Sequence, residues 1–222
     1  MTADPEEEAP LRSPALGRPV GSSGEQTRRR ILEATVRCVG TVGYARATIR
    51  EIAREAGMTS GPLYHYFPNK SELVKAAAEA VTQMAAQRFV EATHRPGTIV
   101  DRLVALLEES DQMIREYPHV AAFDYAIRLE SPRWLNLQDA TATVYRTVLD
   151  LIIEIVTDAK KDGTLDSQID TDGASRAIFA LIRGLTEMAA TTPEEEHHVT
   201  LDVAKSLIRG TLFGTEKAER KR

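Results

Sequence analysis

The sequence has little of what several classes of protein require. Its 222 residues include one cysteine, Cys38, which excludes an internal disulfide framework and a cysteine metal cluster. The longest apolar run, LIIEIV at 151–156, is interrupted by Glu154 and is far shorter than the roughly 20 residues that cross a bilayer. No Gly-rich phosphate loop, nucleophile elbow or HExxH helix occurs, so we expect no enzyme, no cofactor and no metal site.

The first residues also lack the apolar segment of a secretory signal, and they hold Asp4 and three glutamates at 6–8 instead. With the lone cysteine, this predicts a cytoplasmic protein without a membrane partner. Residues 1–22 contain four prolines and no hydrophobic periodicity, and such a segment cannot bury enough apolar surface to fold by itself. We expect a disordered tail over 1–22 and a second flexible tail over 215–222.

What the sequence does have is the composition of a globular protein, 42% hydrophobic and 27% charged. Its net charge of −5 argues at first sight against a nucleic-acid partner, but the charge is unevenly distributed. Residues 24–75 hold nine Lys and Arg against five Asp and Glu, whereas the segments on either side are acidic. We therefore expect the region 24–75 to face an anion.

Helix signals follow one another along the chain and strand-type alternation is absent, so the predicted fold class is all-α. Capping boxes begin helices at Ser23 and Thr48, Gly57 supplies a tight turn, and Asn69 caps a helix directly after Pro68. The expected helices cover 23–43, 48–56, 59–67, 69–93, 97–116, 118–130, 134–162, 171–191 and 194–213. They divide into a helix-turn-helix domain over 23–70 and a ligand-binding and dimerisation bundle over 71–214.

The segment MTSGPLYHYFPNKSEL, residues 58–73, crowds four ring side chains into positions 64–67. Helical spacing puts Leu63 and Phe67 on a face that can pack against the preceding helices, and it puts Tyr64 and His65 on another. A helix of about 10 Å, at roughly 1.5 Å per residue, fits a DNA major groove about 12 Å wide. Together with the preceding helix and the Gly57 turn, this segment predicts a helix-turn-helix.

The polar side chains of this domain divide by the part of DNA that they could contact. Phosphate contacts orient a protein, whereas contacts with base edges specify the sequence. Plainer roles stay open: Thr48 could be only a helix cap, Lys70 a surface lysine, and Tyr64 with His65 a solvated face. The candidates for contacting phosphate groups, or for adding to the positive field that attracts them, are Arg28, Thr48, Arg50, Tyr64, Tyr66 and Lys70. The candidates for allowing close approach to the groove and for contacting base edges are Thr59, Ser60, Gly61 and His65.

The string TIREIAREAGMTSGPLYHYFPNKSEL, preceded by RRRILEATVRCVGTVGY, resembles the DNA-binding domain of TetR-family transcriptional regulators. The resemblance implies that the third helix enters the major groove and that Tyr64 and Tyr66 contact the DNA backbone. It also implies that Lys70 binds a phosphate and that Thr48 begins the second helix of the domain. For the C-terminal half it implies a ligand cavity in a helical bundle and a two-fold dimer.

The helices expected over 97–162 mix polar and aromatic groups among apolar ones, as a pocket for an apolar ligand with one polar end would. Arg128 in this mixture needs an acid such as Asp124, solvent, or an anionic ligand group, because a buried unpaired charge is costly. For any single residue, a place in a plain core is the open alternative. The candidate ligand contacts are Leu103, Leu107, Phe123, Tyr125, Arg128, Trp134, Tyr145, Leu149 and Ile152.

The last two expected helices carry more apolar surface than one core can cover. Apolar residues over 174–188 form a heptad-like seam, and residues 199–212 carry two apolar stripes. One stripe is expected to face the chain's own core and the other a second subunit. The candidate interface residues are Ile178, Leu181, Leu185, Met188, Leu201, Ile208 and Leu212. The PEEEHH run at 193–198 suits a helix start better than a metal site.

These features predict a ligand-responsive transcriptional regulator, expected to be a repressor. It would bind a palindromic double-stranded DNA operator as a homodimer and be released by a small, largely apolar inducer. Two alternatives stay open. One is a DNA-binding protein whose bundle only dimerises and takes no ligand, and the more distant one is a helical enzyme, which the missing acid–base constellation disfavours.

Overall fold

The structure, a computed structural model, describes residues 20–130 and 137–212. Within these residues the chain forms nine helices and no strand, which confirms the all-α prediction. The helices are α1 (Val20–Val42), α2 (Ile49–Glu55), α3 (Ser60–Tyr66), α4 (Lys70–Thr93), α5 (Ile99–Glu116), α6 (Val120–Glu130), α7 (Leu137–Lys161), α8 (Thr171–Thr191) and α9 (Glu194–Ile208). None of them is both long and apolar enough to cross a bilayer.

Several helix ends differ from the prediction by one or more residues, among them the beginning of α1 and the end of α9. Helix α1 begins at Val20, so the capping box predicted at Ser23 does not begin it, and residues 20–22 are helical rather than part of a tail. Helix α9 ends at Ile208 instead of 213, because Gly210 takes a left-handed φ of 67° and turns the chain. The rest of the predicted tails, 1–19 and 215–222, lies outside the described residues, as does Trp134.

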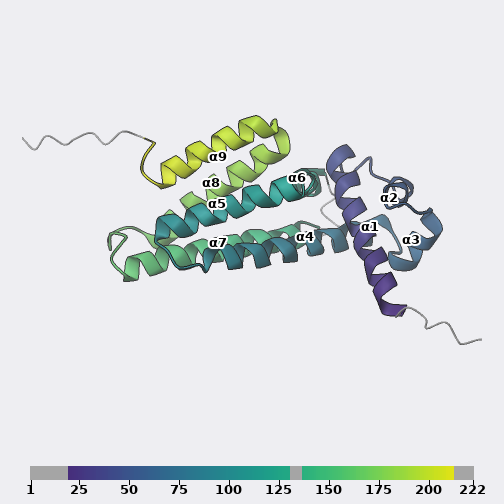
Figure 1. Cartoon of the computed structure of the whole chain (residues 1–222), viewed down its shortest axis with the longest axis horizontal. Coiled ribbons are helices and arrows are strands. Elements are labelled where there is room, and N and C mark those ends of the chain that lie inside the picture. The colour runs from purple at the N-terminus through teal and green to yellow at the C-terminus, as the bar shows by residue number, and fades with distance from the viewer. Residues whose placement is uncertain (1–19, 131–136, 213–222) are drawn as a thin grey trace, which may run out of the picture.

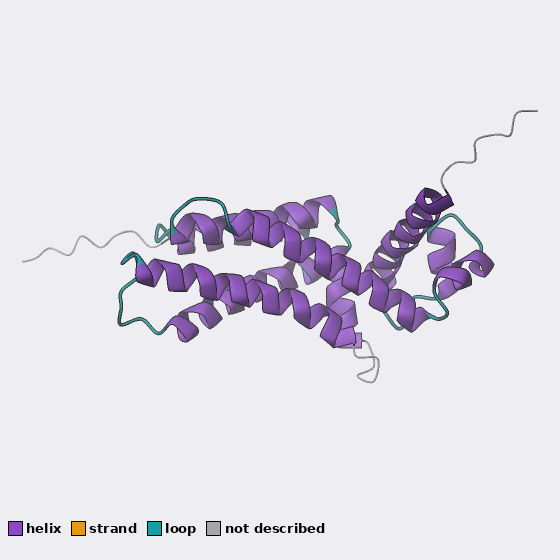
Figure 2. Ribbon diagram, turned by 90° about the horizontal axis from the view of Figure 1, so that it is seen from below, coloured by secondary structure: helices purple, strands orange, loops and turns teal. Residues whose placement is uncertain are grey.

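The helices form a small domain and an elongated bundle joined by α4. Figure 1 shows α1–α3 at one end and α5 and α7–α9 along the bundle, with α4 running from one part into the other. Figure 2, seen from below, shows that only short loops connect the described helices. The arrangement places the predicted DNA-binding domain at one tip of the molecule.

Two hydrophobic cores stabilise these parts, and α4 and α6 link them. The first core joins Ile31, Ile52, Leu63 and Phe67 of the small domain to Leu73 of α4. Phe123 and Ile127 of α6 pack into the same core, so α6 belongs to both parts. The second core fills the bundle and includes Phe89, Leu106, Leu107, Ile152 and Ile155.

Helix α6 touches the small domain at two further points. The Glu130 carboxylate accepts a hydrogen bond from the backbone N–H of Ala45, at 3.2 Å, in the loop between α1 and α2. Gly40 of α1 lies so close to the start of α6 that a Cβ there would come within 2.7 Å of the His119 carbonyl oxygen. A displacement of α6 would therefore be felt directly by α1 and by the loop that leads to α2.

Candidate nucleic-acid interface and ligand cavity

The short helix α3 separates its side chains as helical spacing requires. Leu63 and Phe67 are buried in the first core, whereas Tyr64 and Tyr66 are 52% and 38% exposed and His65 is exposed as well. Gly57, with a φ of 68°, makes the turn between α2 and α3, where a residue with a side chain would be strained. The predicted division between core and surface is confirmed, and the geometry is that of a helix-turn-helix.

The beginning of α3 offers little bulk to an approaching partner. Thr59 occupies the N-cap position without a side-chain capping hydrogen bond, and Ser60 is half-buried. Gly61 is exposed, and a Cβ placed there would meet no atom within 4 Å. Nothing within the described chain therefore requires glycine at this position, which leaves the close approach of a partner as a physical reason for it.

Thr48 is already engaged as a helix cap. Its hydroxyl accepts a hydrogen bond from the Glu51 backbone N–H at 3.2 Å and donates one to Glu51 Oε2 at 2.8 Å. The Glu51 carboxylate also accepts a hydrogen bond from the Thr48 backbone N–H at 3.0 Å. The two hydrogen bonds that the carboxylate accepts from Thr48 lower the pKa of Glu51, so a carboxylate occupies the start of α2. The capping alternative is thus satisfied, and a phosphate at Thr48 would meet a like charge; phosphate binding there stays a prediction.

Lys70 has an interaction that the sequence did not reveal. Its ammonium donates a hydrogen bond to the Tyr44 carbonyl and lies 4.2 Å above the centre of the Tyr44 ring. Partial burial lowers the pKa of Lys70. An ammonium has three donors, so this anchoring leaves others that could reach a phosphate oxygen.

Two arginines of the small domain lie on its surface. The Arg28 guanidinium is 5.6 Å from the centre of the Phe67 ring, which brings α1 close to the end of α3. Arg50, one residue into α2, is exposed. Both can therefore add to the positive field around the exposed face of α3 without being confined to one contact.

The comparison with known families decides what this domain is. Residues 31–77 match the family model described as "Bacterial regulatory proteins, tetR family", a span that runs from within α1 into α4. Residues 31–77 form a TetR-family DNA-binding domain. The helix-turn-helix at α2 and α3 is accordingly its DNA-binding element, and its relatives are regulators rather than enzymes.

Relatives extend the similarity beyond the matched domain. The chain is 27% identical to the HTH-type transcriptional regulator PksA of Bacillus subtilis over 173 residues, 76% of this chain and 81% of that protein. It is 24% identical to UidR of Escherichia coli over 167 residues, 74% and 82% of the two chains. TetR-family similarity thus continues well into the C-terminal bundle.

Solved structures share the fold. FadR of Bacillus subtilis, solved with stearoyl-CoA, has a TM-score of 0.69 at 18% identity and covers 84% of this chain and 98% of its own. GusR of Salmonella enterica has a TM-score of 0.62 at 25% identity and covers 89% and 98%. The nine-helix arrangement is therefore a TetR-family fold over nearly the whole of these neighbours.

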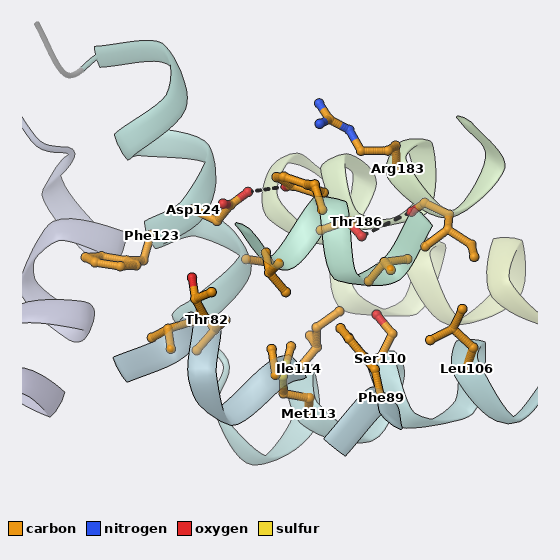
Figure 3. A pocket seen from close by; sticks show the side chains of 18 of the residues that line it. Thr82, Phe89, Leu106, Ser110, Met113, Ile114, Phe123, Asp124, Arg183 and Thr186 are labelled. Atoms are coloured by element: carbon orange, nitrogen blue, oxygen red, sulfur yellow. Dashed lines mark hydrogen bonds between the residues drawn. The ribbon is translucent and has the colours of Figure 1, made fainter. Parts of the chain in front are cut away.

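The C-terminal bundle of this regulator contains an apolar cavity of about 80 Å³ between α4, α5, α6, α7 and α8. Figure 3 shows Phe89, Met113, Ile114 and Phe123 among the side chains around it. Phe123 also belongs to the first core, so the cavity lies beside the junction with the DNA-binding domain. An apolar enclosure between helices of a bundle is a common place for a small ligand.

The predicted ligand contacts coincide only partly with this lining. Phe123 and Tyr145 line the cavity, whereas the other described candidates do not: Leu103, Leu107, Tyr125, Arg128, Leu149 and Ile152. Leu103, Leu107 and Ile152 are buried in the second core instead, which was the plainer alternative. Helix α7 is apolar on most sides, so its sequence could not show that Val144, Tyr145 and Val148 rather than Leu149 and Ile152 face the void.

A charged cluster borders the cavity. Asp124 of α6 accepts a hydrogen bond from Arg128 Nε at 2.9 Å and another from the Tyr145 hydroxyl at 2.5 Å. Of the three partners left open for Arg128, the structure shows the acid Asp124. Burial and the neighbouring Asp124 charge raise the pKa of Tyr145, so its hydroxyl stays protonated and donating. Arg183 of α8, which sequence reasoning missed, lies over the same tyrosine ring.

Helices α8 and α9 divide their apolar side chains differently from the prediction. Leu185 and Leu201 are buried in the subunit's own core, and Ile178, Leu181 and Ile208 pack against that core from its edge. Met188 is half-buried, and Leu212 is exposed beyond the end of α9. The stripe that remains uncovered consists of Val199, Val203 and Leu207, which are 62%, 44% and 43% exposed. Their spacing of four residues places them along one side of α9.

The PEEEHH run begins α9, with Pro193 at the N-cap and the three glutamates in the first turn. His197 points inward and is buried near Asp111 of α5, with its Nε2 4.0 Å from Asp111 Oδ1. His198, half-buried, lies 3.1 Å from the same carboxylate oxygen. The role as a helix start is confirmed, and His197 is left as a buried titratable group.

Proposed function

We propose that the chain is a repressor that binds a palindromic operator as a homodimer and releases it when a small, largely apolar ligand enters the bundle. The observation that carries this proposal is the position of the apolar cavity beside α6, the helix that also packs into the DNA-binding domain. A ligand that moves α6 would act on the DNA-reading helix without touching it.

The DNA-binding face is formed by α3 and its neighbours. Tyr64, Tyr66, Lys70, Arg28 and the start of α2 would hold the phosphate backbone. The start of α3, from Thr59 to Gly61, and His65 would meet the base edges in the major groove. Contacts of the first kind set affinity for all sequences, and contacts of the second kind set the preferred operator.

The dimer would form through α8 and α9. The stripe of Val199, Val203 and Leu207 is exposed in one chain, and exposed apolar stripes of this kind are covered in stable proteins. A two-fold contact would bring the stripe of one subunit against α8 and α9 of the other and present two copies of α3 to two half-sites. Such an arrangement accounts for a palindromic operator.

Ligand entry would require the bundle to change shape. A cavity of about 80 Å³ is well below the roughly 300–1,000 Å³ of pockets for drug-sized ligands. A ligand of that size therefore binds a state with the helices further apart, and its preference for that state shifts the population. Fold neighbours support a ligand role: FadR was solved with stearoyl-CoA, and AibR was solved with isovaleryl coenzyme A and operator DNA.

The signal would pass through α6. Phe123 and Asp124 line the cavity, and about two turns later the Glu130 carboxylate accepts a hydrogen bond from the backbone N–H of Ala45. Gly40 holds α1 against the beginning of α6. When the cavity expands, α6 shifts, α1 follows, and the two α3 helices of the dimer no longer match the spacing of the half-sites.

The test begins by selecting bound fragments from a genomic DNA pool to obtain the operator. Compounds from a metabolite library are then screened for an increase in melting temperature and for release of a labelled operator. The proposal expects at least one compound to do both at the same concentration. If compounds stabilise the protein without releasing DNA, ligand binding does not control the operator and the proposal is wrong. If none binds, the account with a purely structural dimerisation bundle is the better one.

A further inference from the structure

The charged groups around the cavity lie on one side of it, whereas hydroxyl groups such as that of Ser110 also occur on the other. Figure 3 shows Asp124 and Arg183 on the side opposite Phe89 and Met113. The lining between them is made mainly of aliphatic and aromatic side chains. A molecule in the cavity would therefore have an apolar body and one end among charged groups.

The negative charge at this end is already compensated. Asp124 accepts one hydrogen bond from Arg128, at 2.9 Å, and one from Tyr145, at 2.5 Å. A cationic ligand would have to displace Arg128 from Asp124, and breaking a partly buried ion pair of this kind is costly. The carboxylate is thus a poor anchor for an incoming cation.

The positive charge of Arg183 is not compensated in the same way. Its guanidinium carbon lies 4.2 Å from the centre of the Tyr145 ring, and no carboxylate of the described residues lies within ion-pair distance of it. Glu187, one turn later on α8, is exposed and acts on Arg128 only at longer range. A ring face accepts none of the five N–H donors of a guanidinium in a conventional hydrogen bond.

We propose that the cavity takes an amphiphilic carboxylate, with its apolar chain or ring between α4, α5 and α7 and its carboxylate on the guanidinium of Arg183. This ligand class rests on the proposed function, in which the cavity binds the inducer. Arg183 is half-buried, and Figure 3 shows its guanidinium at the outer edge of the lining, where the carboxylate of a ligand whose chain lies in the cavity would meet it. A guanidinium binds a carboxylate through two parallel hydrogen bonds. Tyr145 positions the site: its ring packs against the Arg183 guanidinium, and its hydroxyl keeps its hydrogen bond to Asp124.

The test compares head groups on a constant chain. Binding of octanoate, 1-octanol and octylamine to the purified full chain is measured by titration calorimetry near neutral pH. We expect octanoate to bind about tenfold tighter than octanol, and octylamine to bind weakest. The same three compounds are scored for release of the selected operator.

Matched variants assign the preference to one side chain. Arg183→Gln should remove the preference for octanoate while leaving octanol affinity unchanged. Arg176→Gln, on the same helix but exposed and paired with Asp172 at 2.9 Å, should keep the wild-type preference. Tyr145→Phe should also keep it, because the ring under Arg183 remains. Arg183→Lys should give an intermediate preference, and it serves as the readout if the glutamine variant does not fold.

The outcomes separate the ligand class from the function on which it rests. Equal affinity for octanoate and octanol, an unchanged preference in Arg183→Gln, or tightest binding of octylamine would overturn the carboxylate proposal while the cavity remains a ligand site. If none of the three binds the wild-type chain, the carboxylate proposal is wrong, and the library screen with the operator decides separately whether the chain responds to another ligand.

Discussion

Leu63 and Tyr64 are adjacent in the sequence, yet one is buried in the first core and the other is exposed. This difference was predictable because it follows from helical spacing alone. The engagement of Lys70 with the Tyr44 carbonyl was not, since the two residues are 26 positions apart and only the folded chain brings them together. Thr48 lies between these cases. Its capping box with Glu51 is local and could be predicted from the sequence, but the sequence does not show whether the hydroxyl is also free to contact DNA.

Tyr64 provides the first prediction at this scale. Tyr64→Ala should weaken binding to all DNA sequences by about 1 kcal/mol or more, as expected when a hydrogen bond to a charged group is lost. Tyr64→Phe should show most of that loss if the hydroxyl contacts phosphate. His65→Ala should instead change which bases are tolerated. Affinities measured on a panel of operator variants at fixed salt check this, and unchanged affinity in all three folded variants would contradict it.

Gly61 provides the second prediction at the scale of single residues. Because a Cβ at this exposed position meets no neighbour within 4 Å, Gly61→Ala should leave the free energy of unfolding unchanged or raise it by up to about 1 kcal/mol. The same methyl group should weaken operator binding, since it intrudes where the groove approaches α3. Denaturant unfolding and operator titration of one protein sample measure both effects. Intact binding would mean that α3 stays further from DNA at this point than we propose.

At the scale of helices, boundaries were far easier to predict than faces. Asn69 and Thr98 cap their helices through hydrogen bonds that span three residues, so the short-range pattern contains the information. The faces of α7 and α9 depend on which neighbours pack against them, and several sides of each helix are apolar. For that reason Leu201, predicted at the interface, lies in the core, and Val203, two residues later, remains exposed.

This pair of residues gives a prediction for α9. Val203→Glu should leave the subunit folded and dissociate the dimer, because it would bury unpaired carboxylates at the interface. Leu201→Glu places the same charge in the subunit's own core and should lower the melting temperature sharply instead. Sedimentation and thermal unfolding of the two variants distinguish the cases. An undisturbed dimer in Val203→Glu would place the interface on another surface.

For the whole molecule, the two cores and the elements that bridge them determine how distant sites are coupled. The sequence predicted an α-helical regulator with a DNA-binding domain and a bundle, because those features follow from periodicity, caps and the 58–73 segment. The cavity lining could not be predicted, because a void is a property of packing between five helices. Arg183 interrupts a mainly apolar stretch of α8, and this charge was the signal in the sequence that could have indicated a polar group at the cavity.

The packing of α9 on α5 gives the molecule a pH dependence. Burial lowers the pKa of His197 below its ordinary value of 6.5, so the unfolded chain binds this proton more readily than the folded one. Stability should therefore be constant near pH 7 and above and should fall as the pH drops below about 6.5, with a slope of up to roughly 1.4 kcal/mol per pH unit.

Urea unfolding across this pH range measures the effect. His197→Leu should flatten the dependence, whereas the half-exposed neighbour in His198→Gln should leave most of it. An equally steep slope in His197→Leu would show that the pH dependence does not come from His197.

The close contact between Gly40 and α6 predicts a mutation that would abolish regulation. A single nucleotide change that converts this glycine to alanine would force the backbone at His119 to move, since a methyl carbon cannot remain 2.7 Å from its carbonyl oxygen. The two halves of the protein would be pushed apart without any small molecule, so a cell with this allele would express the controlled genes permanently. Selection for such constitutive strains should therefore recover codon 40, which encodes neither a proposed DNA contact nor a residue that lines the cavity.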